Sequence, residues 1–226
     1  MHILILADGD APARAGLDTV WPGWDDAIAM VIAADGGARH ADRLGVALDR
    51  WVGDGDSIDP DELERLQRAG IAADRSPEEK DESDTELAIN EAIGLGATRL
   101  TIVGALGGPR LDHALANLGL LLLPGLTKID VRVLDATARI RLLSATDTDG
   151  ARPECSLPGR IGDMVSLLPV GADAVGVSTR GLRYPLADET LRVGRTRGLS
   201  NVREQLVAEV TLRGGRLLVV EAPATL

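Results

Sequence analysis

The sequence of 226 residues has no phenylalanine, one tyrosine and three tryptophans, so few aromatic rings are available to stack on a ligand. It has one cysteine, Cys155, which rules out an internal disulfide and is typical of a reducing cytoplasm. No apolar run reaches the roughly 18 residues that a membrane helix needs. The first residues also lack the basic stretch of a signal peptide. We therefore expect a cytoplasmic protein with no membrane partner.

Positive charge is scarce as well. Lys and Arg number 24 against 35 Asp and Glu, which gives a formal net charge of −11, and only Lys80 and Lys128 are lysines. Nucleic-acid phosphates require a basic face, so the composition argues against a nucleic-acid partner. With 45% hydrophobic residues the chain can bury a sizeable core, as one large domain or two smaller ones.

Several familiar catalytic motifs are missing. The sequence has no Gly-x-x-x-x-Gly-Lys-Ser/Thr phosphate loop, no Gly-x-Gly-x-x-Gly dinucleotide fingerprint and no Gly-x-Ser-x-Gly nucleophile elbow. Any bound nucleotide must therefore be held by metal and glycine-rich loops instead of a phosphate-loop lysine.

The first 130 or so residues alternate between strand and helix patterns. Asp59 and Ser83 are predicted N-caps of helices that end near Gly70 and near 94–96, and a further helix is predicted over 111–123. A succession of strands and helices favours a mostly parallel sheet. Unbroken apolar runs predict its strands at 3–6, 29–33, 51–52 and 100–103.

After residue 130 the pattern changes to short strand-like segments separated by Gly, Pro and Asp turns. Such spacing is typical of a β-sandwich. The segments are 130–134, 139–143, 164–168, 174–177, 206–212 and 216–221. The predicted fold class is α/β, with an N-terminal α/β sandwich over 1–135 that binds a nucleotide and a smaller C-terminal β-sandwich over 136–226.

Four acidic or glycine-rich motifs each follow a predicted strand or begin a predicted helix. Open α/β sheets bind ligands beyond the carboxyl ends of their strands, and helix N-termini attract phosphate oxygens. Converging carboxylates repel one another unless a cation lies between them, and hard oxygen ligands suit Mg²⁺ carrying a polyphosphate. The motifs therefore predict phosphoryl or nucleotidyl transfer. They are 34–37, 53–57, 80–84 and 104–113.

Each motif taken alone also has an ordinary structural explanation. Asp35 can be a turn residue before two glycines. Asp81 and Asp84 can interact with a helix dipole, and Gly107-Gly108 can be a flexible turn. The prediction of function therefore depends on the four motifs occurring together.

The order of the motifs resembles that of the thiamine pyrophosphokinase family. The family patterns Ala-Asp-Gly-Gly-Ala, Gly-Asp-x-Asp-Ser, Lys-Asp-x-x-Asp and Gly-Gly-Arg-x-Asp-His with a later Asn correspond here to 34–38, 53–57, 80–84 and 107–113 with Asn117. The segments 181–186 and 200–201 match the family's Gly-Leu-x-Tyr-Pro-Leu and Ser-Asn. Two departures are Pro109, inserted before Arg110, and Gly55, which replaces a bulkier residue.

The resemblance implies a thiamine diphosphokinase, which converts ATP and thiamine into thiamine diphosphate and AMP. It implies Mg²⁺ held by Asp54, Asp56, Asp81 and Asp84, of which Asp84 is also counted as catalytic. Lys80 and Arg110 would neutralise phosphate oxygens, and Asp112 would orient or deprotonate the alcohol or serve as a further metal ligand. The implied ATP-binding residues are Asp35, Gly36, Gly37, Asp54, Asp56, Ser57, Gly104, Gly107, Gly108 and Asn117.

On the thiamine side the resemblance implies Tyr184, Ser200 and Asn201, although Tyr184 can equally be a core residue. It also implies a homodimer with active sites at the subunit interface. Two alternatives are a catalytically inactive nucleotide-binding or scaffold module and a nucleotide-dependent transferase with another alcohol acceptor. The retained acidic residues argue against the scaffold, which has no physical use for uncompensated carboxylates.

Overall fold

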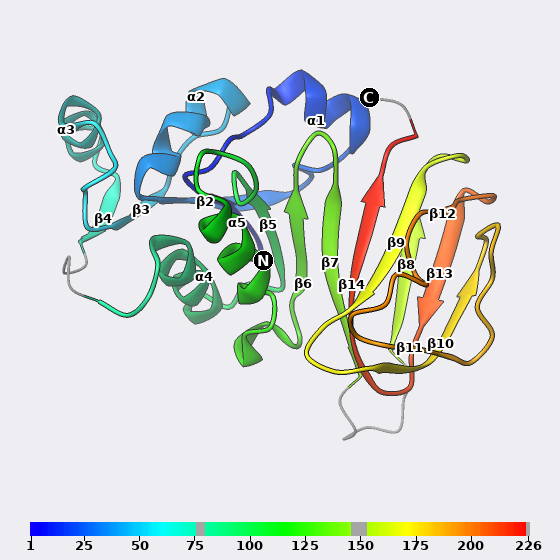
Figure 1. Ribbon diagram of the computed structural model, residues 1–226. Helices are drawn as coiled ribbons and strands as arrows, with labels where there is room; N and C mark the ends of the chain where they lie inside the picture. Colours follow the sequence, from blue (N-terminus) through cyan, green and yellow to red (C-terminus); the bar gives the residue numbers. More distant parts are fainter. Residues whose placement is uncertain (76–79, 146–152, 225–226) are drawn as a thin grey trace. The chain divides into compact units, whose positions relative to one another are not determined.

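The computed structural model describes residues 1–75, 80–145 and 153–224 (Figure 1). It divides into two compact units, Met1–Ala136 and Thr137–Leu226, which are described separately below. Among the described residues, no helix is both long and apolar enough to cross a membrane.

The first unit contains a parallel sheet with the strand order β6-β5-β1-β2-β3-β4. Each strand except β4 has at least two buried residues, which explains the unbroken apolar runs in the sequence. The strands are β1 (His2–Leu6), β2 (Ile28–Ala34), β3 (Arg50–Gly53), β4 (Ala72–Arg75), β5 (Arg99–Val103) and β6 (Asp130–Leu134).

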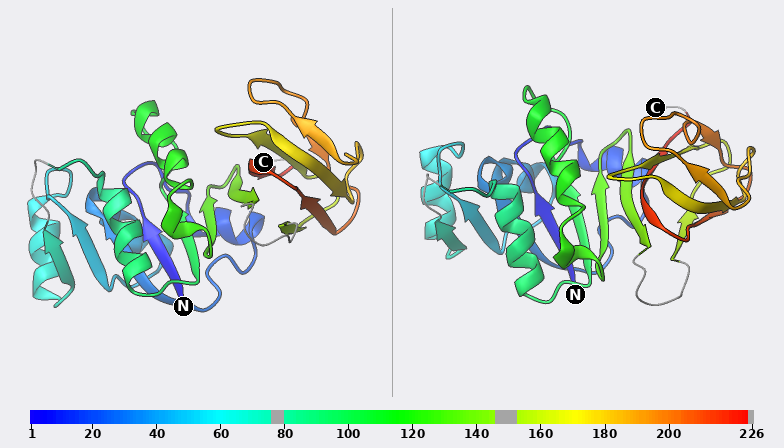
Figure 2. Two further views of the ribbon diagram at one scale, coloured as in Figure 1. Left: turned by 90° about the horizontal axis from the view of Figure 1, so that it is seen from below. Right: turned by 60° about the horizontal axis from the view of Figure 1, so that its bottom comes forward.

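Helices cover both faces of this sheet (Figures 1 and 2). Leu17, Leu44 and Leu66, from α1, α2 and α3, belong to one core cluster with Leu4 and Leu6 of β1. On the other face, α4 buries Ala88, Ile89 and Ala92. The helices are α1 (Arg14–Val20), α2 (His40–Leu44), α3 (Pro60–Arg68), α4 (Asp84–Gly94) and α5 (Leu111–Leu120), with the short 3₁₀ helices η1 (Asp35–Arg39) and η2 (Pro124–Leu126).

The predicted helix starts are confirmed. The Asp59 side chain accepts a hydrogen bond from the Asp61 amide at 2.9 Å, and the Ser83 hydroxyl accepts one from the Glu86 amide at 3.2 Å. The third predicted helix ends at Leu120, three residues earlier than expected. In the first unit, α1, α2 and β4 have no counterpart among the predicted elements. The strand β4 is exposed along its whole length, so no burial pattern marks it in the sequence.

The described part of the second unit forms two antiparallel sheets, with the orders β12-β9-β14-β7 and β11-β10-β13-β8. A core cluster containing Leu167, Val177, Val210, Leu217 and Val219 combines residues from both sheets, which makes this unit a β-sandwich. The strands are β7 (Arg139–Ala145), β8 (Glu154–Pro158), β9 (Met164–Pro169), β10 (Ala174–Arg180), β11 (Glu189–Leu191), β12 (Asn201–Val202), β13 (Val207–Thr211) and β14 (Gly215–Ala222). The predicted fold class is confirmed.

A buried ionic cluster connects the two sheets of the sandwich. Glu221 on β14 is 1% exposed and accepts hydrogen bonds from Arg139 at 2.7 Å and from Arg141 and Arg203 at 2.9 Å. Arg139 also donates to the Pro158 carbonyl of β8, in the opposite sheet, at 3.0 Å. The Glu221 carboxylate therefore forms ion pairs with three guanidinium groups inside this unit.

Candidate active site

The strand order of the first unit fixes where a ligand can bind. From β1 the chain builds the sheet outward through β2, β3 and β4 on one side, and then continues with β5 and β6 on the other. The connections that leave β1 and β5 therefore lead to strands on opposite sides of this adjacent parallel pair, and the carboxyl ends at such a point are the usual ligand position in these sheets. A cavity of about 360 Å³ lies there, and its lining includes Asp8, Asp35, Ser57, Asp84, Gly108 and Asn117.

Three carboxylates converge at this edge of the sheet. Asp35, Asp54 and Asp84 each place one oxygen within 4.8 Å of the other two. Asp35 is buried; its Oδ2 accepts a hydrogen bond from the Ser57 amide at 2.8 Å, while its Oδ1 has no hydrogen-bond partner among the described residues. A buried, unsatisfied oxygen among hard oxygen ligands fits Mg²⁺.

Electrostatics supports the same interpretation. Burial raises the pKa of Asp35, and the nearby charges of Asp84 and Asp54 raise it further. Asp35 also has a φ of 41°, in the left-handed region that few residues other than glycine adopt. The protein thus holds a carboxylate in a costly position, and a cation between the three acids would offset the electrostatic part of that cost.

The glycines beside Asp35 have a packing reason. A Cβ atom on Gly37 would lie 2.1 Å from the carbonyl oxygen of Leu6, at the end of β1. A Cβ atom on Gly53 would lie 2.9 Å from the Cβ of Asp35. These glycines let η1 pass close to β1 and β3, which brings Asp35 beside Asp54.

Lys80 lies between two of these acids. Its Nζ is 3.2 Å from Asp54 Oδ2 and 2.5 Å from Asp84 Oδ1. Burial lowers the pKa of Lys80, but the hydrogen bonds to Asp84 and Asp54 outweigh it and raise the pKa overall. The predicted contact of Lys80 with phosphate stays a prediction, and the structure shows the side chain bridging two carboxylates.

Asp56 and Asp81, also predicted metal ligands, are outside this group of three. Asp54 Oδ1 accepts a hydrogen bond from the Asp56 amide at 3.0 Å, which closes a tight turn, and the exposed Asp56 side chain accepts a hydrogen bond from Ser57 Oγ at 2.7 Å. Asp81 is exposed just before α4. The metal role of both residues stays a prediction. The structure brings in Asp35, which the sequence had suggested only as an ATP-binding residue.

The glycine-rich loop after β5 reaches the same cavity. Gly104, Gly107 and Gly108 have φ values of 78°, 76° and 82°, which glycine adopts without strain. Asn117 on α5 donates a hydrogen bond to the carbonyl oxygen of Ala105 at 2.9 Å, so its amide supports the loop from the helix side. The cavity is thus lined by backbone that carries no side chain at Gly107 and Gly108.

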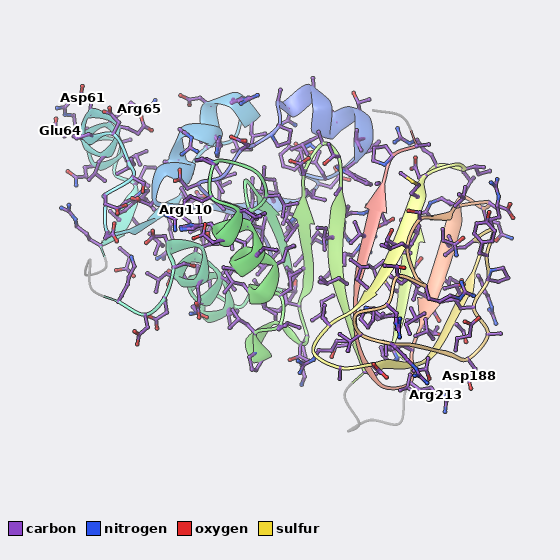
Figure 3. The ribbon with its side chains drawn as sticks, viewed as in Figure 1. Asp61, Glu64, Arg65, Arg110, Asp188 and Arg213 are labelled. Atoms are coloured by element: carbon purple, nitrogen blue, oxygen red, sulfur yellow. The ribbon has the colours of Figure 1, made fainter. Side chains whose placement is uncertain are left out.

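Arg110 and Asp112 form an exposed ion pair at the start of α5. Figure 3 labels Arg110. The two hydrogen bonds measure 3.0 Å and 2.6 Å. Hydrogen bonding from Arg110 lowers the pKa of Asp112 to about 2. A group with so low a pKa is a poor proton acceptor near neutrality, so orienting the alcohol suits Asp112 better than deprotonating it.

In the second unit, Asn201 holds the segment that carries Tyr184. The Asn201 Oδ1 accepts hydrogen bonds from the Tyr184 and Val202 amides at 3.0 Å and 2.9 Å, and its Nδ2 donates to the Tyr184 carbonyl at 2.7 Å. The Tyr184 side chain is 56% exposed, so it is not a core residue. Ser200, with a φ of 56°, is exposed next to Asn201. A small hollow of about 50 Å³ beside Tyr184 is also lined by Leu186 and Asn201.

Some residues at the cavity were not predicted from the sequence. Asp8, in the loop after β1, and Thr85, on α4, line the cavity, and Arg39 forms an ion pair with Asp8. Asp10 lies in the same loop and contacts Gly108. The sequence signal was available, because Asp8 and Asp10 directly follow the first predicted strand. Its meaning depends on the strand order, which places β1 next to β5.

Fold and site together define an α/β protein with a C-terminal β-sandwich and an acidic, glycine-lined cavity that suits a cation–phosphate ligand. Family comparison agrees with this class. Residues 23–133 match the family model described as thiamin pyrophosphokinase, catalytic domain, and residues 154–217 match that described as thiamin pyrophosphokinase, vitamin B1 binding domain. The chain belongs to the thiamine pyrophosphokinase family.

Individual relatives support the assignment. A thiamine pyrophosphokinase of Bacillus subtilis (strain 168) is 28% identical over 179 residues, which cover 79% of this chain and 80% of the relative. Thiamine pyrophosphokinase 1 of Oryza sativa subsp. japonica is 26% identical over 209 residues, covering 83% and 76%.

Solved structures show the same fold. The crystal structure of thiamine pyrophosphokinase from Bacillus subtilis superimposes with a TM-score of 0.81 at 24% identity and covers 99% of both chains. Thiamin pyrophosphokinase from Candida albicans gives a TM-score of 0.76 at 15% identity, over 98% of this chain and 88% of that one.

Proposed function

We propose that this protein is a thiamine diphosphokinase that transfers a pyrophosphoryl group from ATP to thiamine. The hydroxyethyl oxygen of thiamine attacks the β-phosphorus of ATP, the bond from that phosphorus to the oxygen bridging to the α-phosphorus breaks, and AMP leaves with the bridging oxygen. The proton of the alcohol is released. The convergence of Asp35, Asp54 and Asp84 at the carboxyl edge of a parallel sheet carries this proposal, because it suits a cation–polyphosphate complex.

Asp35, Asp54 and Asp84 are the residues that the geometry favours as Mg²⁺ ligands, and Asp56 and Asp81 are further candidates from the sequence. Bound Mg²⁺ supplies positive charge that neutralises the polyphosphate. Lys80 holds the Asp54 and Asp84 side chains in place, since it hydrogen-bonds to both.

The remaining residues of the first unit hold the ligands. The loop over 104–108 presents glycine backbone to the phosphates, which lets them approach closely. Arg110 supplies positive charge at the start of α5, and Asp112 orients the attacking alcohol. ATP is the co-substrate implied by the family. We assign ATP binding to the first unit, which the sequence-based division gives as 1–135.

We assign the acceptor to the β-sandwich, where Tyr184, Ser200 and Asn201 form the candidate thiamine site. We also propose a homodimer whose active sites lie at the subunit interface. Leu111 and Leu115 in the first unit and Leu206 in the second are more than 60% exposed, and such apolar side chains favour a partner surface. The single cysteine supports a cytoplasmic location.

The first test is the reaction itself. The purified protein with ATP and Mg²⁺ is expected to release AMP only when thiamine is present, with one thiamine diphosphate formed for each AMP. Chromatography of both products measures this ratio. AMP release with another alcohol but not with thiamine would favour a different transferase, and nucleotide binding without any AMP release would favour the inactive module.

A second test addresses the homodimer. Mixing Asp54→Asn with Asn201→Ala subunits is expected to restore activity, because one of the two sites in each heterodimer would combine an intact phosphate site with an intact acceptor site. By this two-fold logic the rate reaches up to about half that of the wild type per heterodimer. A verified heterodimer without rescue, or a monomer by light scattering, would show that each chain builds its own site.

A further inference from the structure

The Gly107-Gly108 turn is fastened to the loop that follows β1. The Gly108 amide donates a hydrogen bond of 2.8 Å to Asp10 Oδ2, across 98 positions of sequence. A Cβ atom on Gly107 would lie 3.2 Å from the Cβ of Asp10, so the aspartate side chain packs closely against this turn. Asp10 is exposed and is not among the residues lining the 360 Å³ cavity.

The beginning of the glycine-rich loop after β5 is held by separate hydrogen bonds. The Gly9 amide donates a hydrogen bond to the Gly104 carbonyl at 2.8 Å, and Asn117 donates one to the Ala105 carbonyl at 2.9 Å. The loop is thus held at its start by Gly9 and Asn117 and at its end by Asp10. The turn needs this support, because glycines with positive φ lose more conformational freedom on ordering than any other residue.

We propose that Asp10 is a positioning residue that fixes the Gly107-Gly108 turn for binding of the donor phosphates. This inference rests on the proposed function, since it takes the cavity to be the phosphate site. Asp10 acts through Gly108 and does not contact the substrate itself. Its charge strengthens the hydrogen bond to the amide, whereas the same charge near a polyphosphate is unfavourable. Asp10 therefore favours phosphate binding through its hydrogen bond to the Gly108 amide, and not through a direct interaction of its charge with the phosphates.

Two substitutions separate the hydrogen bond from the charge. Asp10→Asn keeps an acceptor oxygen for the Gly108 amide, and Asp10→Ala removes it. Glu64→Ala is the control, because it also removes one exposed carboxylate, here from an ion pair with Arg68 on α3 and away from the cavity lining. All three variants are first checked for an unchanged thermal transition.

The first readout is amide hydrogen exchange over 104–110, which requires no activity. Asp10→Ala is expected to speed the exchange of the Gly108 amide about tenfold or more, whereas Asp10→Asn and Glu64→Ala stay within about threefold of the wild type. Unchanged exchange in Asp10→Ala would overturn the proposal, whatever the protein's activity.

The second readout is the separation of the two Michaelis constants. Asp10→Ala is expected to raise KM for ATP about tenfold and to leave KM for thiamine within about twofold, with recovery in Asp10→Asn. Equal losses in both Asp10 variants, or equal changes for both substrates, would contradict a positioning role. If the wild type released no AMP, the proposed function would fail alone, and the exchange measurement together with ATP–Mg²⁺ binding by calorimetry would still decide the role of Asp10.

Discussion

Asp54→Asn is expected to lower kcat about a thousandfold or more while the protein stays folded. The amide keeps the size of the side chain and the oxygen that accepts the Asp56 amide hydrogen bond. It removes the charge of one of three converging carboxylates, the other two being Asp35 and Asp84. With that charge it removes a proposed ligand for the cation that would neutralise the polyphosphate. Losing one group that stabilises transition-state charge typically costs a factor of 100 to about 1,000, and a metal ligand at least as much.

A matched control exists at the opposite edge of the same sheet. Asp130 is the first residue of β6 and pairs with Arg99 and Arg132, so Asp130→Asn makes the same chemical change at the amino ends of the strands. Steady-state kinetics over a Mg²⁺ titration should show near-normal turnover for Asp130→Asn. For Asp54→Asn, added Mg²⁺ should not restore turnover to the wild-type level. Wild-type turnover in Asp54→Asn would remove this residue from the mechanism.

The same assay tests the ligands predicted from the sequence alone. Asp56→Asn changes an exposed carboxylate outside the group of three. A loss of kcat as large as that of Asp54→Asn would place Asp56 among the metal ligands. A much smaller loss would leave Asp35, Asp54 and Asp84 as the proposed ligands. Sequence spacing cannot distinguish these sets, because the two aspartates are separated by one residue.

The class of fold was predictable because burial leaves a clear pattern. The runs at 3–6 and 100–103 are buried on both sides of the strand and almost entirely apolar, as expected for parallel strands between two layers of helices. The edge strand β4 has no such pattern, since all of its residues are exposed. Short strands such as β12, with two residues, are held by hydrogen bonds to β9 and carry too few residues to show a period.

The sequence indicated which side chains lie together better than it indicated the full set of site residues. Asp35 and Asp54 follow buried strands and Asp84 begins a helix, and the structure brings one oxygen of each within 4.8 Å of the others. The contribution of Asp8 and Asp10 depends on β5 inserting beside β1, a long-range pairing that no local pattern encodes. Asn201 was expected to face the acceptor, yet most of its hydrogen-bonding groups hold the backbone around Tyr184. Such a partner becomes visible only when the loop is folded.

Glu221→Gln is expected to destabilise the β-sandwich by about 3–5 kcal/mol, the usual cost of breaking a buried ion pair from one side. Glu221 has a side-chain exposure of 2% and is bonded to Arg139, Arg141 and Arg203. Glutamine keeps the shape but removes the negative charge that binds all three guanidinium groups. Its NH₂ group would also face hydrogen-bond donors where the carboxylate accepted hydrogen bonds.

The control is an exposed pair in the same unit. Arg213 donates two hydrogen bonds to Asp188, at 2.8 Å and 2.7 Å, and the two side chains point toward one another at the surface (Figure 3). Asp188→Asn is expected to cost at most about 1 kcal/mol, because solvent screens the pair. All three tryptophans lie before residue 52, in the first unit, so their fluorescence does not report on the sandwich. Native-state amide exchange in β7 and β14 gives the free energy of unfolding instead.

The pH dependence gives this prediction a sign. Burial alone would raise the pKa of Glu221, but the hydrogen bond from Arg139 and the charges of Arg141, Arg139 and Arg203 outweigh it and lower the pKa below its ordinary value of 4.5. A carboxyl group whose pKa is lower in the folded state adds stability above its unfolded pKa, and this stability is lost as the pH falls toward the folded value. The difference in unfolding free energy between wild type and Glu221→Gln should therefore be constant near neutrality and shrink below about pH 4.5. A difference independent of pH, or one as small as that of Asp188→Asn, would show that the charge of Glu221 does not hold the two sheets together.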